Sequence, residues 1–318
     1  MTPLADACRP SRQHLACRGH LAAAGLGPAA VAAALADGRL VRVRRGVYSP
    51  APLPTRAQHL VSGGSPDPAY VSHVRATLLS LGPTAMAGGR TAAVLWGLDL
   101  FVEPREVEVV VPASRRDRTP RGVTLRRRRD AAAVSHRVLG LEAMKVLSPL
   151  MTVVDCARTR PLREAVVIAD SALRKKLVSL EQLQRYVDAH AGHPDARSLG
   201  RVLDLVDPAS GSVLESLLRF LLATHGLRPD SQVTLTDGAG ARIGRVDFLF
   251  RDERLVVECD GRLWHDPEDA RQRDRVRGNE LERAAWRLLR LTWDEVVHRP
   301  EHVLSLVRDC LLPWPAAA

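Results

Sequence analysis

Residues 245–265 read RVDFLFRDERLVVECDGRLWH, and this stretch decides the expected fold. Two runs rich in Val, Leu and Phe, at 246–250 and 255–260, flank four polar residues. Apolar runs separated by a short polar segment are typical of a β-hairpin. If the four polar residues form the loop, Phe250 pairs with Leu255 and the register of the whole hairpin is set.

In this register Asp247 lies directly opposite Glu258, and side-chain alternation places Asp260 on the same face as Glu258. Like charges this close destabilise an empty site, so the pattern predicts a hard cation such as Mg²⁺, with Asp247, Glu258 and Asp260 as ligands. The alternative is that these acids lie on the solvated face of an edge hairpin. The run Leu255-Val256-Val257 is apolar on both faces, which favours a central strand.

An Asp, about ten residues, then Glu-x-Lys or a substitute, on a hairpin that follows a Glu-bearing helix, resembles the restriction-endonuclease-like (PD-(D/E)xK) nuclease fold. The segment VVECDGRLWH is similar to the Vsr-like branch, in which the strand is followed by Gly and then Trp-His, as Gly261, Trp264 and His265 are here. The resemblance covers residues 213–307. It implies metal-dependent hydrolysis of phosphodiester bonds.

One position departs from the wider superfamily, because Asp260 stands where Lys is usual and no Lys follows Lys176. The resemblance implies that His265 acts as a general acid, a general base or a leaving-group stabiliser. Arg273 or Arg277 would neutralise transition-state charge in place of Lys. The expected catalytic residues are Asp247, Glu258, Asp260, His265, Glu215 and Arg273.

Glu215 lies at the edge of the apolar stripe of the helix that Ser212 opens. It either points toward the acids of the hairpin or serves a capping box, since Ser212-x-x-Glu215 matches that pattern. Both interpretations remain open from the sequence.

The helix expected after His265, which Asp266 and Pro267 open and which runs to about residue 285, is rich in arginine. Arg271 and Arg277 are candidates for contacts to the phosphates of DNA beside the carboxylates. The alternative is a solvent-facing helix whose arginines pair with Glu280 and Glu282.

Residues 11–48 predict a small winged helix-turn-helix, with helices at 12–24 and 28–36 followed by a basic hairpin around Gly46. This progression resembles the N-terminal domain of AbiEi-like antitoxins of type IV toxin–antitoxin systems. The alternative is a winged helix that contacts only protein. The candidates for phosphate contacts are Arg39, Arg42, Arg44 and Arg45.

The middle of the chain also resembles AbiEi-like antitoxins. A helix ending in LWGL at 95–98, a strand at 107–112 and then Thr152-x-x-Asp155 carry that resemblance. It implies a cognate toxin as a partner. We find no catalytic constellation in this region from the sequence.

The chain has 46 Lys and Arg against 36 Asp and Glu, a formal net charge of +10, and this favours nucleic acid as a partner. Five cysteines without any CxxC pair argue against a zinc ribbon or a disulfide framework. No apolar run approaches ~18 residues and no signal-peptide pattern opens the chain, so we expect a cytoplasmic protein without membrane contact.

These patterns predict an α/β multidomain chain. The expected domains are a winged helix-turn-helix at 1–60, an antitoxin-like α/β domain at 61–205 and a restriction-endonuclease-like domain at 206–318. The expected function is DNA binding combined with a Mg²⁺-dependent endonuclease, in defence, repair or a toxin–antitoxin system. The alternative is a non-enzymatic DNA-binding regulator or antitoxin whose nuclease-like domain is inactive.

Overall fold

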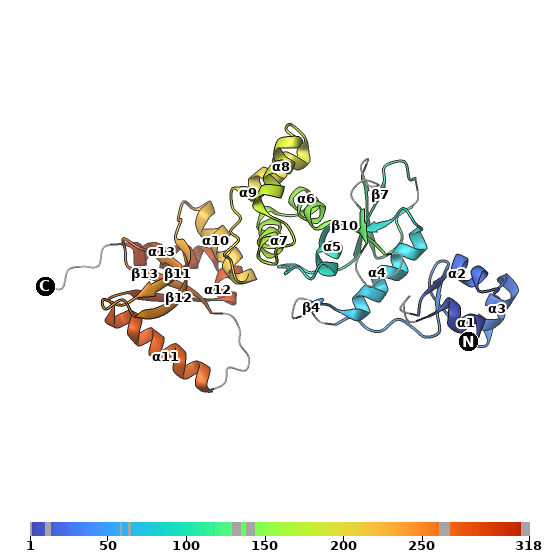
Figure 1. Ribbon diagram of the computed structural model, residues 1–318, viewed down its shortest axis with the longest axis horizontal. Helices are drawn as coiled ribbons and strands as arrows, with labels where there is room; N and C mark the ends of the chain where they lie inside the picture. The colour runs from blue at the N-terminus through green and yellow to red at the C-terminus, as the bar shows by residue number, and fades with distance from the viewer. Residues whose placement is uncertain are drawn as a thin grey trace.

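The computed structural model shows three regions in a row, with the N-terminal and C-terminal regions at opposite ends of an elongated molecule (Figure 1). The structure describes residues 2–9, 14–57, 59–62, 65–116, 118–128, 135–137, 144–260 and 268–312. Within these ranges the side chains at 135–137 and 268–274 are not described. No helix in the described ranges is both long and apolar enough to cross a membrane.

The described part of the N-terminal region has a short first helix, a helix pair and then a hairpin, and a third short strand completes the sheet in the order β1-β3-β2. The helix expected at 12–24 is shorter, because Ala16 and Cys17 pair with β3 and the helix begins only at Arg18. Gly46 has a φ of 73° and forms the turn of the hairpin. The elements are α1 (Pro3–Ala7), β1 (Ala16–Cys17), α2 (Arg18–Ala23), α3 (Pro28–Ala36), β2 (Val41–Arg44) and β3 (Val47–Ser49).

The middle region is a five-stranded sheet of order β8-β7-β6-β10-β9 packed against helices. The sequence did not predict α9, although Pro194 in its first turn is a helix-start signal. The elements are β4 (Val61–Ser62), β5 (Ser65–Pro66), α4 (Pro68–Leu81), β6 (Met86–Ala87), α5 (Gly89–Leu95), β7 (Val107–Pro112), β8 (Val123–Arg128), β9 (Ser135–Arg137), β10 (Lys145–Leu147), α6 (Pro149–Thr159), α7 (Leu162–Arg174), α8 (Leu180–Ala189) and α9 (Pro194–Leu203).

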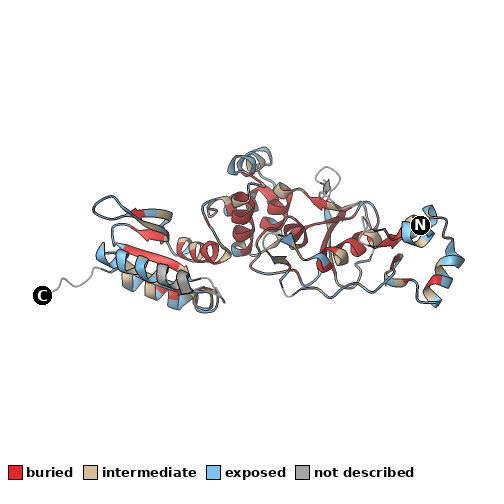
Figure 2. Ribbon diagram, turned by 60° about the horizontal axis from the view of Figure 1, so that its bottom comes forward, coloured by how far each residue is buried: buried red, intermediate tan, exposed pale blue. Residues whose placement is uncertain are grey.

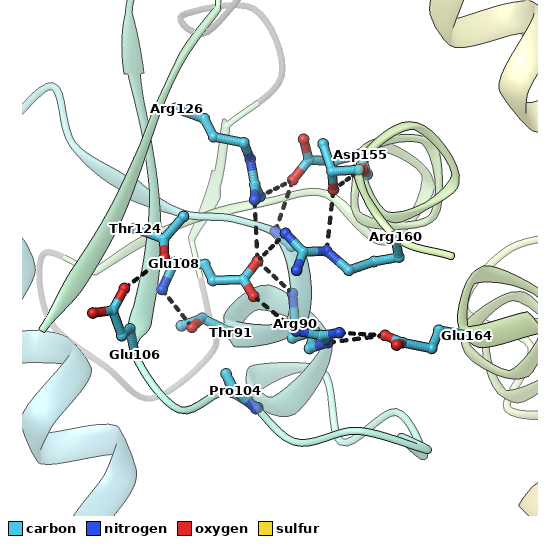
Figure 3. A network of polar contacts seen from close by, with 12 residues as sticks. Arg90, Thr91, Pro104, Glu106, Glu108, Thr124, Arg126, Asp155, Arg160 and Glu164 are labelled. Carbon is cyan, nitrogen blue, oxygen red and sulfur yellow. Dashed lines mark hydrogen bonds and ion pairs between the residues drawn. The ribbon is translucent and has the colours of Figure 1, made fainter. Parts of the chain in front are cut away.

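A network of ion pairs joins the sheet and helices of this region (Figure 3). Arg126 on β8 lies 3.1 Å from Glu108 on β7 and 2.5 Å from Asp155 on α6. Arg90 on α5 pairs with Glu164 on α7 at 2.5 Å. The Arg126 side chain is therefore directed into the region, toward these two carboxylates.

The C-terminal region is a mixed sheet of order β11-β12-β13-β14, in which only β13 and β14 are parallel. The predicted hairpin register is confirmed, because Phe250 pairs with Leu255. The elements are α10 (Val213–Thr224), β11 (Asp230–Thr236), β12 (Arg242–Phe250), β13 (Leu255–Asp260), α11 (Glu268–Arg283), β14 (Arg287–Thr292), α12 (Trp293–His298) and α13 (Pro300–Leu311).

Helices cover both faces of this sheet, and its central strands are buried between them (Figure 2). On one face α11 inserts Leu281 among residues that include Val246 and Val256. On the other face α10, α12 and α13 pack over Phe248 and Val257. Burial on both faces explains why the β13 sequence is apolar without alternation and confirms a central strand.

The C-terminal region shares its core with the middle region, because Val167 of α7 packs in the same cluster as α10. Arg219 of α10 pairs with the buried Asp170 of α7 at 2.5 Å. Phe101 and Trp293 contact one another with ring centroids 6.1 Å apart. The two regions are therefore held together by apolar packing and by a buried ion pair.

Candidate functional site

Glu215 lies at the N-terminal turn of α10 with only 8% of its surface exposed. Ser212 caps the helix by accepting the Glu215 N–H at 3.1 Å. The Glu215 carboxylate does not close the box onto Ser212; it accepts the Gly211 N–H at 2.8 Å. A Cβ on Gly211 would lie 3.0 Å from a Glu215 oxygen, so glycine leaves the space that this carboxylate fills.

Asp247 lies on β12 just beyond the last pair that β12 forms with β13, Phe248 with Val257. Its Oδ2 accepts the backbone N–H of Cys259 at 2.9 Å, and this bond spans the two strands. Its Oδ1 accepts the Gln232 side-chain amide at 3.0 Å, and the same amide nitrogen lies 2.7 Å from Glu215 Oε2. Glu215 and Asp247 therefore converge on one amide group.

Glu258 lies on β13 and is bound by two arginines. Arg277 of α11 donates to its Oε1 and also to the Arg245 carbonyl, while Arg290 of β14 lies 3.7 Å from its Oε2. The Arg277 side chain passes over Gly244, where a Cβ would lie 2.9 Å from Nε. Glu258 is thus neutralised by protein cations from two neighbouring elements.

Residues 215–311, from α10 to α13, match the protein-family model REase_MTES_1575. Glu215, Asp247 and Glu258 all lie inside this match. The C-terminal domain is restriction-endonuclease-like.

Two proteins of Mycobacterium tuberculosis resemble most of the chain. The uncharacterized proteins MT2308 of strain CDC 1551 and Rv2248 of strain H37Rv are each 26% identical over 272 residues, which is 85% of this chain and 92% of the relative. The crystal structure of the RV2827C protein from the same organism superposes with a TM-score of 0.34 and 21% identity, over 58% of this chain and 68% of that one.

The restriction-endonuclease-like domain does not bring together the three carboxylates expected from the hairpin. Among residues with described side chains, no three His, Cys, Asp or Glu side chains form a group that could hold a metal ion. The hairpin register is as predicted, but the side chains of β12 do not alternate strictly between the two faces of the sheet. The strand pairs run from Ser231 with Phe248 to Val233 with Val246, and the intervening position is not paired. Asp247 therefore turns toward Glu215 of α10, whereas Glu258 points toward α11.

The remaining expected residues fall in different places. Asp260 is exposed at the end of β13, opposite Thr292. His265 lies outside the described residues, and the side chains of Arg271 and Arg273 do too. Arg277 is half-buried and pairs with Glu258, and its expected contact with DNA phosphates stays a prediction.

The two converging carboxylates are in an electrostatically unfavourable position. Burial, and then the neighbouring Asp247 carboxylate, raise the pKa of Glu215, although the Gly211 N–H opposes this. Burial also raises the pKa of the Cys259 thiol, with Asp247, Glu215 and Glu258 adding to the effect. The negative charge between β11, β12 and α10 is therefore stabilised by neutral donors, the Gln232 amide and the backbone N–H groups of Gly211 and Cys259.

The donors at this point suit a hard divalent cation. Mg²⁺ is commonly held by one or two carboxylates, with water and substrate phosphates completing its shell. Glu215 and Asp247 supply two carboxylate oxygens that already converge, so they fit such an ion. Glu258 does not fit in this arrangement, because its oxygens are taken by Arg277 and Arg290.

Sequence reasoning missed Gln232 and Arg290. Gln232 carries no motif, and a polar side chain in an edge strand is ordinary. Arg290 is the parallel-strand partner of Glu258, and this pairing could be found only by knowing that β14 lies beside β13.

Proposed function

We propose that this protein binds DNA and that its C-terminal domain is a Mg²⁺-dependent endonuclease that hydrolyses phosphodiester bonds. The observation that carries the proposal is the convergence of Glu215 and Asp247 on Gln232 within a restriction-endonuclease-like domain. When bound, the cation would polarise the phosphate and lower the pKa of an attacking water.

The chain's own residues support this chemistry by binding and orientation. Glu215 and Asp247 are each anchored by one backbone N–H, from Gly211 and from Cys259, so their oxygens are held in place before any ligand arrives. His265, by its Vsr-like context, is proposed to move a proton to or from the reacting oxygen. Arg273 is proposed to contact the phosphate.

A nicking experiment with the full-length protein and supercoiled plasmid tests this proposal. Wild type is expected to nick DNA with Mg²⁺ or Mn²⁺ and not with chelator. Asp247→Asn is expected to lose on the order of 10²-fold or more in rate, because removal of one ligand charge weakens stabilisation of the transition state. Asp230→Asn is the matched control, since Asp230 is exposed and pairs only with Arg251 on the surface of the same domain. Equal rates for wild type and Asp247→Asn would contradict the proposal.

A non-enzymatic DNA-binding regulator is the second candidate, and one observation favours it. Glu258 is neutralised by Arg277 and Arg290, and Asp260 stands at the usual Lys position, so two positions of the family pattern lack their usual arrangement. This candidate predicts DNA binding without nicking under any metal. The AbiEi-like resemblance, and the cognate toxin that it implies as a partner, fit this second candidate and stay predictions.

The N-terminal region is the proposed DNA-binding part. Two helices and a basic hairpin are the elements that a winged helix uses. Arg42 and Arg45 on the hairpin are exposed, Arg44 is half-buried, and Arg39 pairs with Asp37 at 2.6 Å. Helix α3 has the sequence PAAVAAALA and carries no side chain that could hydrogen-bond a base edge. We therefore expect contacts to phosphates rather than to bases.

Replacing Arg42 and Arg45 together with alanine is expected to weaken binding to unrelated duplexes by a similar factor. Each lost phosphate contact removes about one unit from the slope of log affinity against log salt, so the slope should flatten by about two. Fluorescence anisotropy at several salt concentrations measures this. Arg185→Ala is the control, because Arg185 is exposed on α8 of the middle region. An unchanged slope would assign the hairpin to protein contact.

A further inference from the structure

Gln232 has an unusual backbone for a strand residue. Its φ is 55°, in the left-handed region that residues other than glycine rarely adopt. It lies in the middle of β11, and the regular pairing with β12 is interrupted at this residue, opposite Asp247. Strain of this kind persists where the surrounding structure requires it, and it gathers at functional sites.

The strained backbone places the Gln232 side chain between Glu215 and Asp247. The Gln232 Nε2 donates to Glu215 Oε2 at 2.7 Å and to Asp247 Oδ1 at 3.0 Å. One neutral NH₂ group thus meets two carboxylates that would otherwise repel one another. A Lys at this position would cancel one of the two negative charges permanently, whereas an amide leaves both available to a cation.

Each carboxylate also accepts a hydrogen bond from a backbone N–H group, so Gln232 is not its only hydrogen-bond donor. Glu215 is held by the Gly211 N–H at 2.8 Å, and Asp247 by the Cys259 N–H at 2.9 Å. These two bonds come from backbone groups on different elements, the turn before α10 and the strand β13. The contribution that belongs to Gln232 alone is therefore to occupy and bridge the space between the acids.

We propose that Gln232 is a positioning residue and a neutral ligand of the divalent-cation site, an inference that rests on the proposed function. Without the cation its NH₂ group bridges Glu215 and Asp247. With the cation the amide turns over and presents its carbonyl oxygen, which hard cations accept as a ligand. The terminal amide torsion is broad and roughly two-fold, so this rotation needs no backbone change.

Calorimetric titration of Mg²⁺ and Mn²⁺ into the full-length protein, without DNA, tests this role. Gln232→Leu keeps a similar volume and removes both polar groups, and is expected to weaken metal binding about tenfold or more. Gln232→Gly removes the side chain and relieves the backbone strain, so it should fold at least as well as wild type and bind metal as weakly as Gln232→Leu.

Gln232→Glu supplies an oxygen ligand with a charge. It is expected to bind metal at least as tightly as wild type, and to melt at a lower temperature than wild type in chelator because three carboxylates meet. Gln184→Leu is the matched control, since Gln184 is exposed on α8 and bonds only Asp188. It should leave the metal affinity unchanged.

The outcomes separate the inference from the proposed function. A wild type that binds neither metal overturns the proposed metal site and the role of Gln232 with it. If wild type binds metal and both Gln232→Leu and Gln232→Gly bind it equally well, the cation site stands and Gln232 only packs against it. Weakened binding in both variants with retained folding supports the inference.

Discussion

The Gly89→Ala protein is expected to lose about 3–5 kcal/mol of unfolding free energy in the middle region, from crowding and a disrupted buried ion pair. A Cβ at this position would overlap the Glu108 carboxylate and lie 2.5 Å from Arg126. Glu108 and Arg126 hold β7 to β8, and Asp155 accepts the Gly89 N–H at 2.8 Å. The added methyl group must therefore displace charged groups whose partners are buried.

Thermal unfolding followed by circular dichroism measures this effect. The transition of the middle region should shift down by on the order of 10 °C. Gly122→Ala is the matched control, because Gly122 also has a positive φ, 72°, but has nothing within 4 Å of a Cβ. It reports the cost of backbone strain alone. Equal losses in the two variants would mean that the ion-pair network tolerates the methyl group.

Asp170→Asn is expected to be nearly as destabilising, by about 3–5 kcal/mol, because it removes the closer of two carboxylates from the largely buried Arg219 guanidinium and leaves Asp207 at 4.0 Å from its Nε. Asp170 is fully buried on α7, and Arg219 comes from α10 of the C-terminal domain. Asn preserves the shape and an oxygen that can accept the Asp207 N–H, now 2.8 Å from Asp170 Oδ1. The loss of charge is therefore separated from the loss of packing.

The measurement for this variant is the number of unfolding transitions as well as their midpoints. Two domains that share a core should unfold together in wild type and separate when the contact between them weakens. Asp230→Asn breaks the exposed pair with Arg251 and should leave the melting curve almost unchanged. A single transition at the wild-type temperature for Asp170→Asn would show that apolar packing alone couples the domains.

The hairpin of the C-terminal domain could be predicted because its determinants are local. Two apolar runs and four polar residues fix the pair of Phe250 with Leu255, and nothing distant competes with it. Glu215 was found for a similar reason, since a capping residue and an apolar stripe place it on a short stretch of helix. The structure adds which way its carboxylate turns.

The partners of the acids could not be predicted from the hairpin. The strand β11 interrupts the alternation of β12 at Asp247, and α11 and β14 bring Arg277 and Arg290 to Glu258. These contacts depend on which strands and helices become neighbours. In the middle region the same limit applies, because Glu108, Arg126 and Asp155 are far apart in the sequence and only the sheet and α6 bring them together (Figure 3).

The packing of α10 on α7 sets how the parts of this chain can be exchanged by recombination. A gene fragment encoding only residues from 206 onward would produce a domain whose helix α10 lacks Val167 and Asp170 of α7. The apolar face of α10 would be exposed, and Arg219 would lose its ion pair with Asp170. The N-terminal region has its own small core around Leu21, Leu40 and Tyr48, but it also packs Leu15 and Val47 against Ala76 of α4. An exchange of the N-terminal region must therefore preserve an apolar contact with α4, whereas an exchange of the C-terminal region must preserve both apolar packing and an ion pair with α7.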